Sequence, residues 1–297
     1  MAQPDLILPV EAVHELPEVR TITVADLRRA LELGIDDFRA MPTHAIFLVL
    51  IYPIAGLLMA AATFGYDFVP LLYPLASGFA LLGPFAAIGL YELSRRRESG
   101  LDTSWSHAFD IVHSASFRTI VILGLLLFGL FAIWIVLANG MYLAYFGNRD
   151  TVTIGQFIHD LLFTREGRTL AIVGNVIGLL FAIVAFTLTV VSFPLLLDRN
   201  VGFAAAIVTS TRAVLKNPLV MAMWGLIVAA GLAIGSLPLL VGLAIVLPIL
   251  GHSTWHLYRM VVVPDPRSRP VFRSPVKGRR YAAEFPASLF ARHRPDE

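Results

Sequence analysis

The sequence has no cysteine and, for 297 residues, little charge. Without cysteine the chain can form no disulfide, iron–sulfur cluster, Cys-ligated zinc site or thiol nucleophile. Charged residues make up 15% of the chain and apolar residues 57%, whereas soluble domains usually carry roughly 25% charged residues. One soluble core could not bury so much apolar surface, so the composition predicts a protein of the lipid bilayer.

Several motifs are also missing. There is no Gly-rich phosphate loop, no GxSxG or HExxH motif, no carboxylate pair within an apolar segment and no folded basic module. We therefore expect no catalytic residues, no cofactor and no nucleic-acid partner. Residues 1–19 lack Lys and Arg, and no long apolar run precedes residue 45. We expect no secretory signal, so the first span has to serve as the insertion signal.

Six apolar segments have about the ~20 residues that cross a ~30 Å hydrocarbon core. The last two are separated only by a short turn at Ser236–Pro238, which predicts a tight hairpin. The alternative is five spans, with 219–258 forming one kinked element. The six predicted spans are 45–64, 69–93, 119–145, 170–197, 219–237 and 240–258.

Positive charge predicts the orientation of these spans, because cytoplasmic loops are enriched in Lys and Arg. With the N-terminus placed inside, only Arg149, Arg165 and Arg168 of the 23 Lys and Arg residues fall in outer segments. The sequence therefore predicts that both ends of the chain are cytoplasmic.

Amphipathic helices are predicted between the spans at 24–39, 104–118 and 202–216, lying in the inner interface. Thr23 and Asp26 have the spacing of a capping box at the start of the first. A fourth amphipathic stripe, 154–162, lies in an outer segment, and we expect it to end at Gly167.

The three inner helices share a register anchored on Ala30, Ala108 and Ala206, and each leads into a pair of spans. Pro84 and Pro248 also begin similar stretches, each followed by an aromatic residue, Leu and Arg at offsets of seven, nine and eleven. The predicted fold is all-α: six transmembrane helices in three parallel repeats of an interfacial helix plus a hairpin. The predicted boundaries are a flexible segment 1–23, a membrane domain 24–261 (units 24–97, 104–199 and 201–260) and a tail 262–297.

The tail is rich in Pro and Arg and cannot form a packed core. Each basic residue near an anionic leaflet contributes roughly 1 kcal/mol of attraction. We therefore expect the bilayer, and anionic lipids in particular, to be partners, with other membrane proteins as a further class of candidate partner. The residues predicted to lie at this interface are Arg28, Arg29, Arg39, Arg95, Arg96, Arg97, Trp105, Phe203, Arg279 and Arg280.

Ionisable residues of the spans gather near the predicted inner face. Glu92 ends the second span, and His252 and His256 lie four apart in the sixth. Such a pair can ligate a metal if Glu92 or His113 completes the site, or one His could bind a haem. We favour a third interpretation without a metal, in which the histidines hydrogen-bond carbonyls or Glu92, and Arg95 and Arg96 neutralise Glu92.

Small residues predict where helices approach closely. Gly174 and Gly178 flank Asn175 in the fourth span, and Gly231 and Gly235 repeat the spacing in the fifth. This spacing lets helix backbones meet, and an Asn side chain can bond across them.

Particular stretches resemble the bacterial family of predicted integral membrane proteins called DUF2189. They are Val24–Leu27, Ala30–Leu31, Asp37–Arg39, Gly83–Glu92, Leu196–Arg199, Leu250–His252 and Trp255–Arg259. The segment from Phe193 to Ala213 is more distantly similar to the membrane domain of some glycerophosphodiester phosphodiesterases, whose hydrolase domain has no counterpart here. The DUF2189 resemblance implies a multi-pass protein of the bacterial inner membrane and implies no activity.

Three functions fit these observations. The first is a non-enzymatic scaffold, accessory or lipid-interacting component of the membrane. The second is a transporter or channel for a small or amphiphilic solute. The third is an accessory subunit of a respiratory complex such as cytochrome c oxidase.

Overall fold

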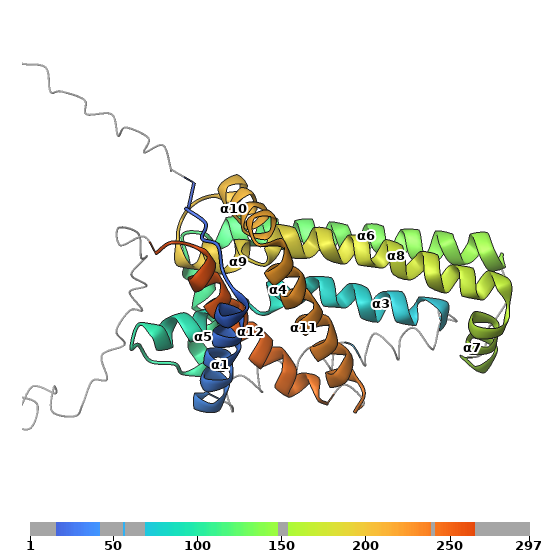
Figure 1. Ribbon diagram of the computed structural model, residues 1–297, viewed down its shortest axis with the longest axis horizontal. Coiled ribbons are helices and arrows are strands. Elements are labelled where there is room, and N and C mark those ends of the chain that lie inside the picture. Colours follow the sequence, from blue (N-terminus) through green and yellow to red (C-terminus); the bar gives the residue numbers. More distant parts are fainter. Residues whose placement is uncertain (1–15, 42–55, 57–68, 148–153, 239–240, 265–297) are drawn as a thin grey trace, which may run out of the picture.

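The computed structural model describes residues 16–41, 56, 69–147, 154–238 and 241–264, and over these residues the chain is helical (Figure 1). The predicted first span, 45–64, falls outside them apart from residue 56, and so does nearly all of the tail. The elements are α1 Val24–Ala40, η1 Val69–Leu71, α3 Leu72–Phe79, η2 Ala80–Leu82, α4 Gly83–Ala86, α5 Ile88–Glu98, η3 Trp105–His113, α6 Phe117–Phe146, α7 Ile154–Phe163, α8 Arg165–Thr189, α9 Ser192–Asp198, α10 Phe203–Lys216, α11 Pro218–Ser236 and α12 Leu243–Val261.

Four stretches of the described chain are long and apolar enough to cross a membrane. They coincide with the predicted second to fifth spans, and large apolar side chains such as Leu125 and Val136 of α6 stay exposed, as lipid-facing residues do. α12, the predicted sixth span, is not among them, since its C-terminal half carries polar residues. The four stretches are Leu72–Glu98, Phe117–Phe146, Arg165–Asp198 and Pro218–Ser236.

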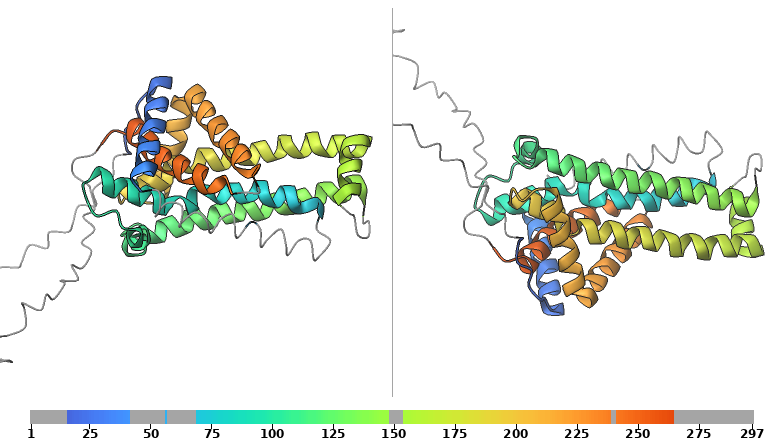
Figure 2. Two further views of the ribbon diagram at one scale, coloured as in Figure 1. Left: turned by 90° about the horizontal axis from the view of Figure 1, so that it is seen from below. Right: turned by 90° about the horizontal axis from the view of Figure 1, so that it is seen from above.

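The segment 219–258 forms two helices, so the alternative of a single kinked element is wrong. α11 and α12 pack against each other where Gly231 and Gly235 face Leu243 and Val246. Figures 1 and 2 show that the far end of this hairpin lies well short of α7, which caps the end of α6 and α8.

The segments predicted to be interfacial helices are helical, with two differences. α1 begins with the predicted capping box of Thr23 and Asp26, and α10 and α7 are α-helical. The segment Trp105–His113 is instead a 3-10 helix. The fourth amphipathic stripe forms α7, which ends at Phe163 rather than at Gly167, and Gly167 lies inside α8. Gly is needed there for a different reason: a Cβ atom at Gly167 would lie 2.1 Å from the Asp160 carbonyl oxygen of α7.

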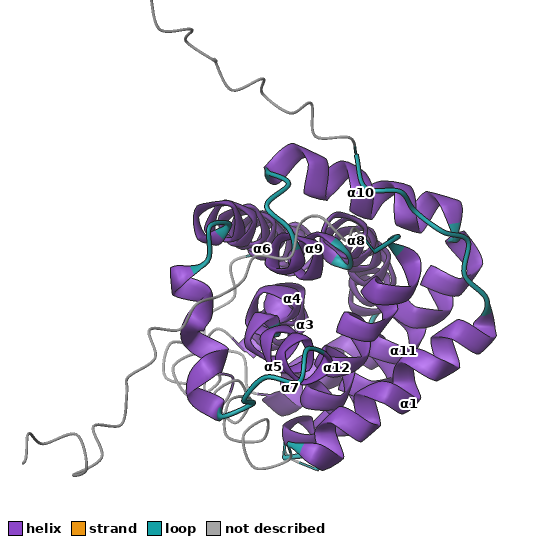
Figure 3. Cartoon of the chain, turned by 90° about the vertical axis from the view of Figure 1, so that its left-hand side faces the viewer, coloured by secondary structure: helices purple, strands orange, loops and turns teal. Residues whose placement is uncertain are grey.

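Seen along the long axis, α5, α9 and α12 contact one another, and α1, η3 and α10 lie around them (Figure 3). α1 packs on α12, η3 on α5, and α10 on α8 and α9. η3 and α10 thus each cover the end of the preceding predicted unit, and α1 covers the end of the last one. The anchors Ala30, Ala108 and Ala206 are all buried in these contacts.

Residues 16–23 form an extended strap that joins distant parts of the chain. The Arg20 N–H donates to the Val261 carbonyl over 2.7 Å, and the Val263 N–H donates to the Glu18 carbonyl over 2.9 Å. On the other side of the strap, the Asn217 side chain accepts from the Ile22 N–H and donates to the Arg20 carbonyl. This part of the segment predicted to be flexible is therefore held at the same end of the molecule as Val261–Val263.

Candidate functional site

α1 and α12 meet at a contact that only glycine permits. Leu27, Ala30, Gly34 and Asp37 form the buried face of α1, at spacings of three and four residues. A Cβ atom at Gly34 would lie 2.0 Å from the Ser253 Oγ and 2.6 Å from the Ser253 backbone nitrogen. The two backbones therefore approach closely, which brings the last turn of α1 against the polar side chains of α12.

Asp37 is the centre of a buried polar cluster formed by α1, α5 and α12. Its side chain is almost fully buried, and its Oδ2 accepts from the Ser94 hydroxyl at 2.6 Å and from the His256 Nε2–H at 2.8 Å. Arg97 forms an ion pair with the other oxygen. Burial raises the pKa of Asp37, but the hydrogen bonds from His256 and Ser94 outweigh it and hold the pKa below its ordinary value. One carboxylate thereby joins three helices.

His252 extends the cluster into the bundle. Its Nδ1 lies 2.7 Å from the Ser94 Oγ, and its side chain is fully buried. Because the single hydroxyl hydrogen of Ser94 goes to Asp37, Nδ1 must carry the hydrogen and donate to Ser94. The Nε2 of His252 and the Oγ of Ser253 have no hydrogen-bond partner among the described residues.

Glu92 lies in a separate cluster. Both of its oxygens accept from Arg95, each at 2.7 Å, and Arg96 approaches at 3.7 Å. Arg96 also donates to the Asp102 carbonyl over 2.5 Å and pairs with Asp110 at 3.4 Å. Arg95 and Arg96, predicted to contact the leaflet, are therefore buried in ion pairs and unavailable to headgroups in this conformation.

A third cluster ties α5, α9 and α12 together. Glu98 accepts from Arg259 at 2.8 Å and from the Trp255 indole at 3.1 Å. The Tyr258 hydroxyl donates to Asp198 over 2.6 Å, and Arg259 lies 3.5 Å from the same carboxylate. The carboxylates of Asp37, Glu98 and Asp198 bond to side chains of other helices, an arrangement suited to holding helices together.

Among the metal candidates whose side chains the structure describes, Glu92 lies apart from the two histidines. Glu92 pairs with arginines, and His252 and His256 meet Asp37 and Ser94. The side chain of His113 lies outside those described, and the described residues contain no group of three or more His, Cys, Asp or Glu that could hold a metal ion. The interpretation without a metal predicts that Arg95 and Arg96 neutralise Glu92, and the structure confirms this. It does not predict that His256 bonds to Asp37 and His252 to Ser94. Asp37 could have been found, because it continues the Leu27, Ala30 and Gly34 face.

The predicted packing residues lie at helix contacts, with one exception. The Tyr73 hydroxyl of α3 donates to the Asn175 Oδ1 of α8 over 2.7 Å. Gly178 faces the Trp134 ring of α6, whereas nothing lies within 4 Å of a Cβ atom at Gly174. Gly231 and Gly235 lie against α12, as described above.

The remaining interface candidates fall into three groups. Arg28, Arg29 and Arg39 are exposed, but each pairs with a carboxylate of α1 itself. Arg97 is partly exposed, and Phe203 packs partly buried against the main core. The side chain of Trp105, and both Arg279 and Arg280, lie outside the described part of the chain.

The apolar stretches and the helical fold together define a helical integral membrane protein. The family described as "Predicted integral membrane protein (DUF2189)" matches residues 72–198, which confirms the family resemblance over this part of the chain. Neither a curated protein nor a solved structure matches the chain, and nothing supports the distant similarity to phosphodiesterase membrane domains.

Proposed function

We propose that the protein is a non-enzymatic, multi-pass component of the bacterial inner membrane whose cytoplasmic end binds anionic lipids. The observation that carries this proposal is the gathering of positive charge at one end of the molecule. Lys216 lies in the last turn of α10 and Arg212 one turn earlier, and both are exposed, as are Arg20 in the strap and Arg97 in the last turn of α5, whereas Arg95, Arg96 and Arg259 are taken up by ion pairs within the chain. These turns lie at the end opposite α7, together with the strap (Figure 1).

The buried clusters support a structural role for the ionisable groups. Asp37, Glu98 and Asp198 bond to side chains of other helices and so hold helices together, whereas Glu92 pairs with Arg95 and Arg96 of its own helix. The exposed cations remain for an external partner, and an anionic leaflet attracts each with roughly 1 kcal/mol. The transporter and the respiratory subunit stay predictions that co-purification of partners from native membranes can distinguish.

Anionic lipid is expected to stabilise the protein. The full chain is reconstituted in nanodiscs of phosphatidylcholine alone or mixed with phosphatidylglycerol, and its unfolding temperature is measured at low and high salt. We expect a higher unfolding temperature with phosphatidylglycerol, and the difference should shrink as salt rises, because exposed charges are screened beyond about 8 Å at physiological ionic strength. Equal temperatures in both lipids at low salt would overturn the proposal.

The six-span, three-repeat arrangement is part of the same proposal. It is supported by the way each interfacial helix covers the end of the preceding unit. The chain has no cysteine, so single cysteines report topology without background labelling. In Leu237→Cys, at the exposed turn between α11 and α12, we expect labelling by an impermeant maleimide from the periplasm. In Ser99→Cys, after α5, labelling should require permeabilised membranes; protection of Leu237→Cys from outside would contradict the sixth span.

A further inference from the structure

One face of α10 is exposed, apolar and interrupted by a single arginine. Val208, Arg212 and Leu215 recur at spacings of four and three residues, so they share a face of α10, and Leu219 follows in the first turn of α11. Leu215 and Leu219 are 72% and 71% exposed. A helix with such a face lies against the acyl boundary of a bilayer, where an arginine reaches the headgroups.

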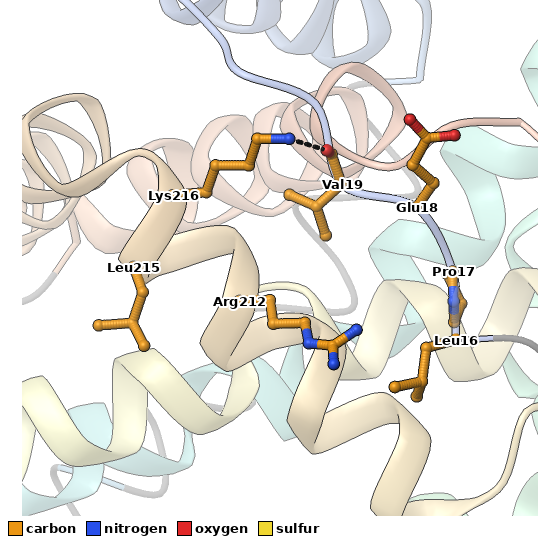
Figure 4. A pocket seen from close by; sticks show the side chains of 7 residues that line it. All are labelled: Leu16, Pro17, Glu18, Val19, Arg212, Leu215 and Lys216. Carbon is orange, nitrogen blue, oxygen red and sulfur yellow. Dashed lines mark hydrogen bonds between the residues drawn. The ribbon is translucent and has the colours of Figure 1, made fainter.

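The arginine lies in a groove between α10 and the strap. The groove has a volume of about 550 Å³, within the range of small-ligand sites. Figure 4 shows the Arg212 guanidinium reaching from α10 toward Leu16 and Pro17, with Leu215 on the other side. The Glu18 carboxylate points away from Arg212. The groove thus combines a cation with apolar walls.

The two neighbouring positive charges of this groove, on Arg212 and Lys216, would be stabilised by a bound anion. Lys216 lies one helical turn from Arg212, and like charges at this spacing repel each other. The Lys216 Nζ donates one of its three hydrogens to the Val19 carbonyl over 2.7 Å, which places its charge at the edge of the groove. Arg212 forms no hydrogen bond or ion pair with any described residue. An anion between the two side chains would relieve the repulsion.

We propose that this groove binds the phosphate of an anionic phospholipid, with an acyl chain lying over Leu215 and Leu219. The inference rests on the proposed function and assigns it one site. The guanidinium fork matches two phosphate oxygens. A lipid fits better than a soluble phosphate, because the exposed leucines beside the cation gain from apolar contact. An anionic headgroup fits better than phosphatidylcholine, whose own ammonium would meet Lys216.

The test is native mass spectrometry of the full chain in an uncharged detergent, after addition of phosphatidylglycerol or phosphatidylcholine. We expect the wild type to retain phosphatidylglycerol at concentrations at which phosphatidylcholine is lost. Arg212→Ala should lower the affinity for phosphatidylglycerol about tenfold, because a charge-assisted bidentate contact is lost. Leu215→Gln should weaken binding of the lipid but not of soluble glycerol phosphate.

The matched control is Arg168→Ala, an exposed arginine near the opposite end of the molecule that should retain the lipid like the wild type. An unchanged affinity of Arg212→Ala for phosphatidylglycerol overturns the proposal that the groove is the lipid site, even where nanodiscs still show stabilisation by anionic lipid. Glycerol phosphate binding as tightly as the lipid also overturns it, in favour of a soluble ligand. If the wild type has no preference in either assay, both proposals fall.

Discussion

Replacement of Gly34 by alanine is expected to force α1 away from α12 and lower the free energy of unfolding by about 3 kcal/mol. The added Cβ atom would lie 2.0 Å from the Ser253 Oγ and 2.8 Å from the Ser253 Cα. The hydroxyl can rotate away, but the backbone of α12 cannot move without disturbing Asp37 and His256. Thermal unfolding in detergent measures the loss.

Gly129→Ala is the control for this substitution. Gly129 also lies within a helix, and nothing lies within 4 Å of its added Cβ atom. Since alanine is the better helix former by about 1 kcal/mol, this variant should match or exceed the stability of the wild type. If Gly34→Ala is as stable as Gly129→Ala, α1 is not seated on α12 as described.

Asp37→Asn is expected to destabilise the protein by about 3–5 kcal/mol, the cost of removing one partner from a buried charge network. The substitution removes the negative charge to which Ser94, His256 and Arg97 donate. Asp36→Asn is the adjacent control. Its carboxylate is exposed and lies 3.8 Å from Arg39, so its loss should cost about 0.5 kcal/mol or less.

The ionisation of Asp37 also predicts how the stability of the protein depends on pH. The pKa of Asp37 is held below its ordinary value in the folded state. Its ionised form therefore contributes stability that is fully present above the unfolded pKa of about 3.9 and is lost as pH falls through the lower folded pKa. The stability gap between wild type and Asp37→Asn should shrink in acid below about pH 4. A gap that stays constant from pH 7 to pH 3 would show that the charge of Asp37 is not what joins the helices.

Apolar length and periodicity were sufficient to predict most of the helices. A count of apolar residues is enough to predict the stretches that form α6, α8 and α11, and the cap at Thr23 predicts where α1 begins. The 3-10 form of Trp105–His113 could not be predicted, because its apolar spacing fits an α-helix equally well. The position of Gly167 inside α8 could not be predicted either, because it depends on how closely α7 folds back on α8.

The polar cluster was predicted only in part, since its contacts join segments far apart in the sequence. Arg95 and Arg96 are three and four residues from Glu92, a spacing that a helix converts into contact. No local rule connects His256 with Asp37, and the sequence interpretation gave backbone carbonyls or Glu92 as the partners of the histidines. The strap was missed for the same reason, because its hydrogen bonds are made to Asn217 and Val261.

The partners of α1 have a consequence for biosynthesis. Asp37 and His256 are separated by 219 residues. At a translation rate of 5–20 residues per second, α1 waits roughly 10–40 s for α12 to be made. During that interval Asp37 has neither its imidazole partner nor the surface that buries it, so α1 cannot complete its buried contacts. α1 can therefore pack against α12 only late in synthesis, after α12 has been made.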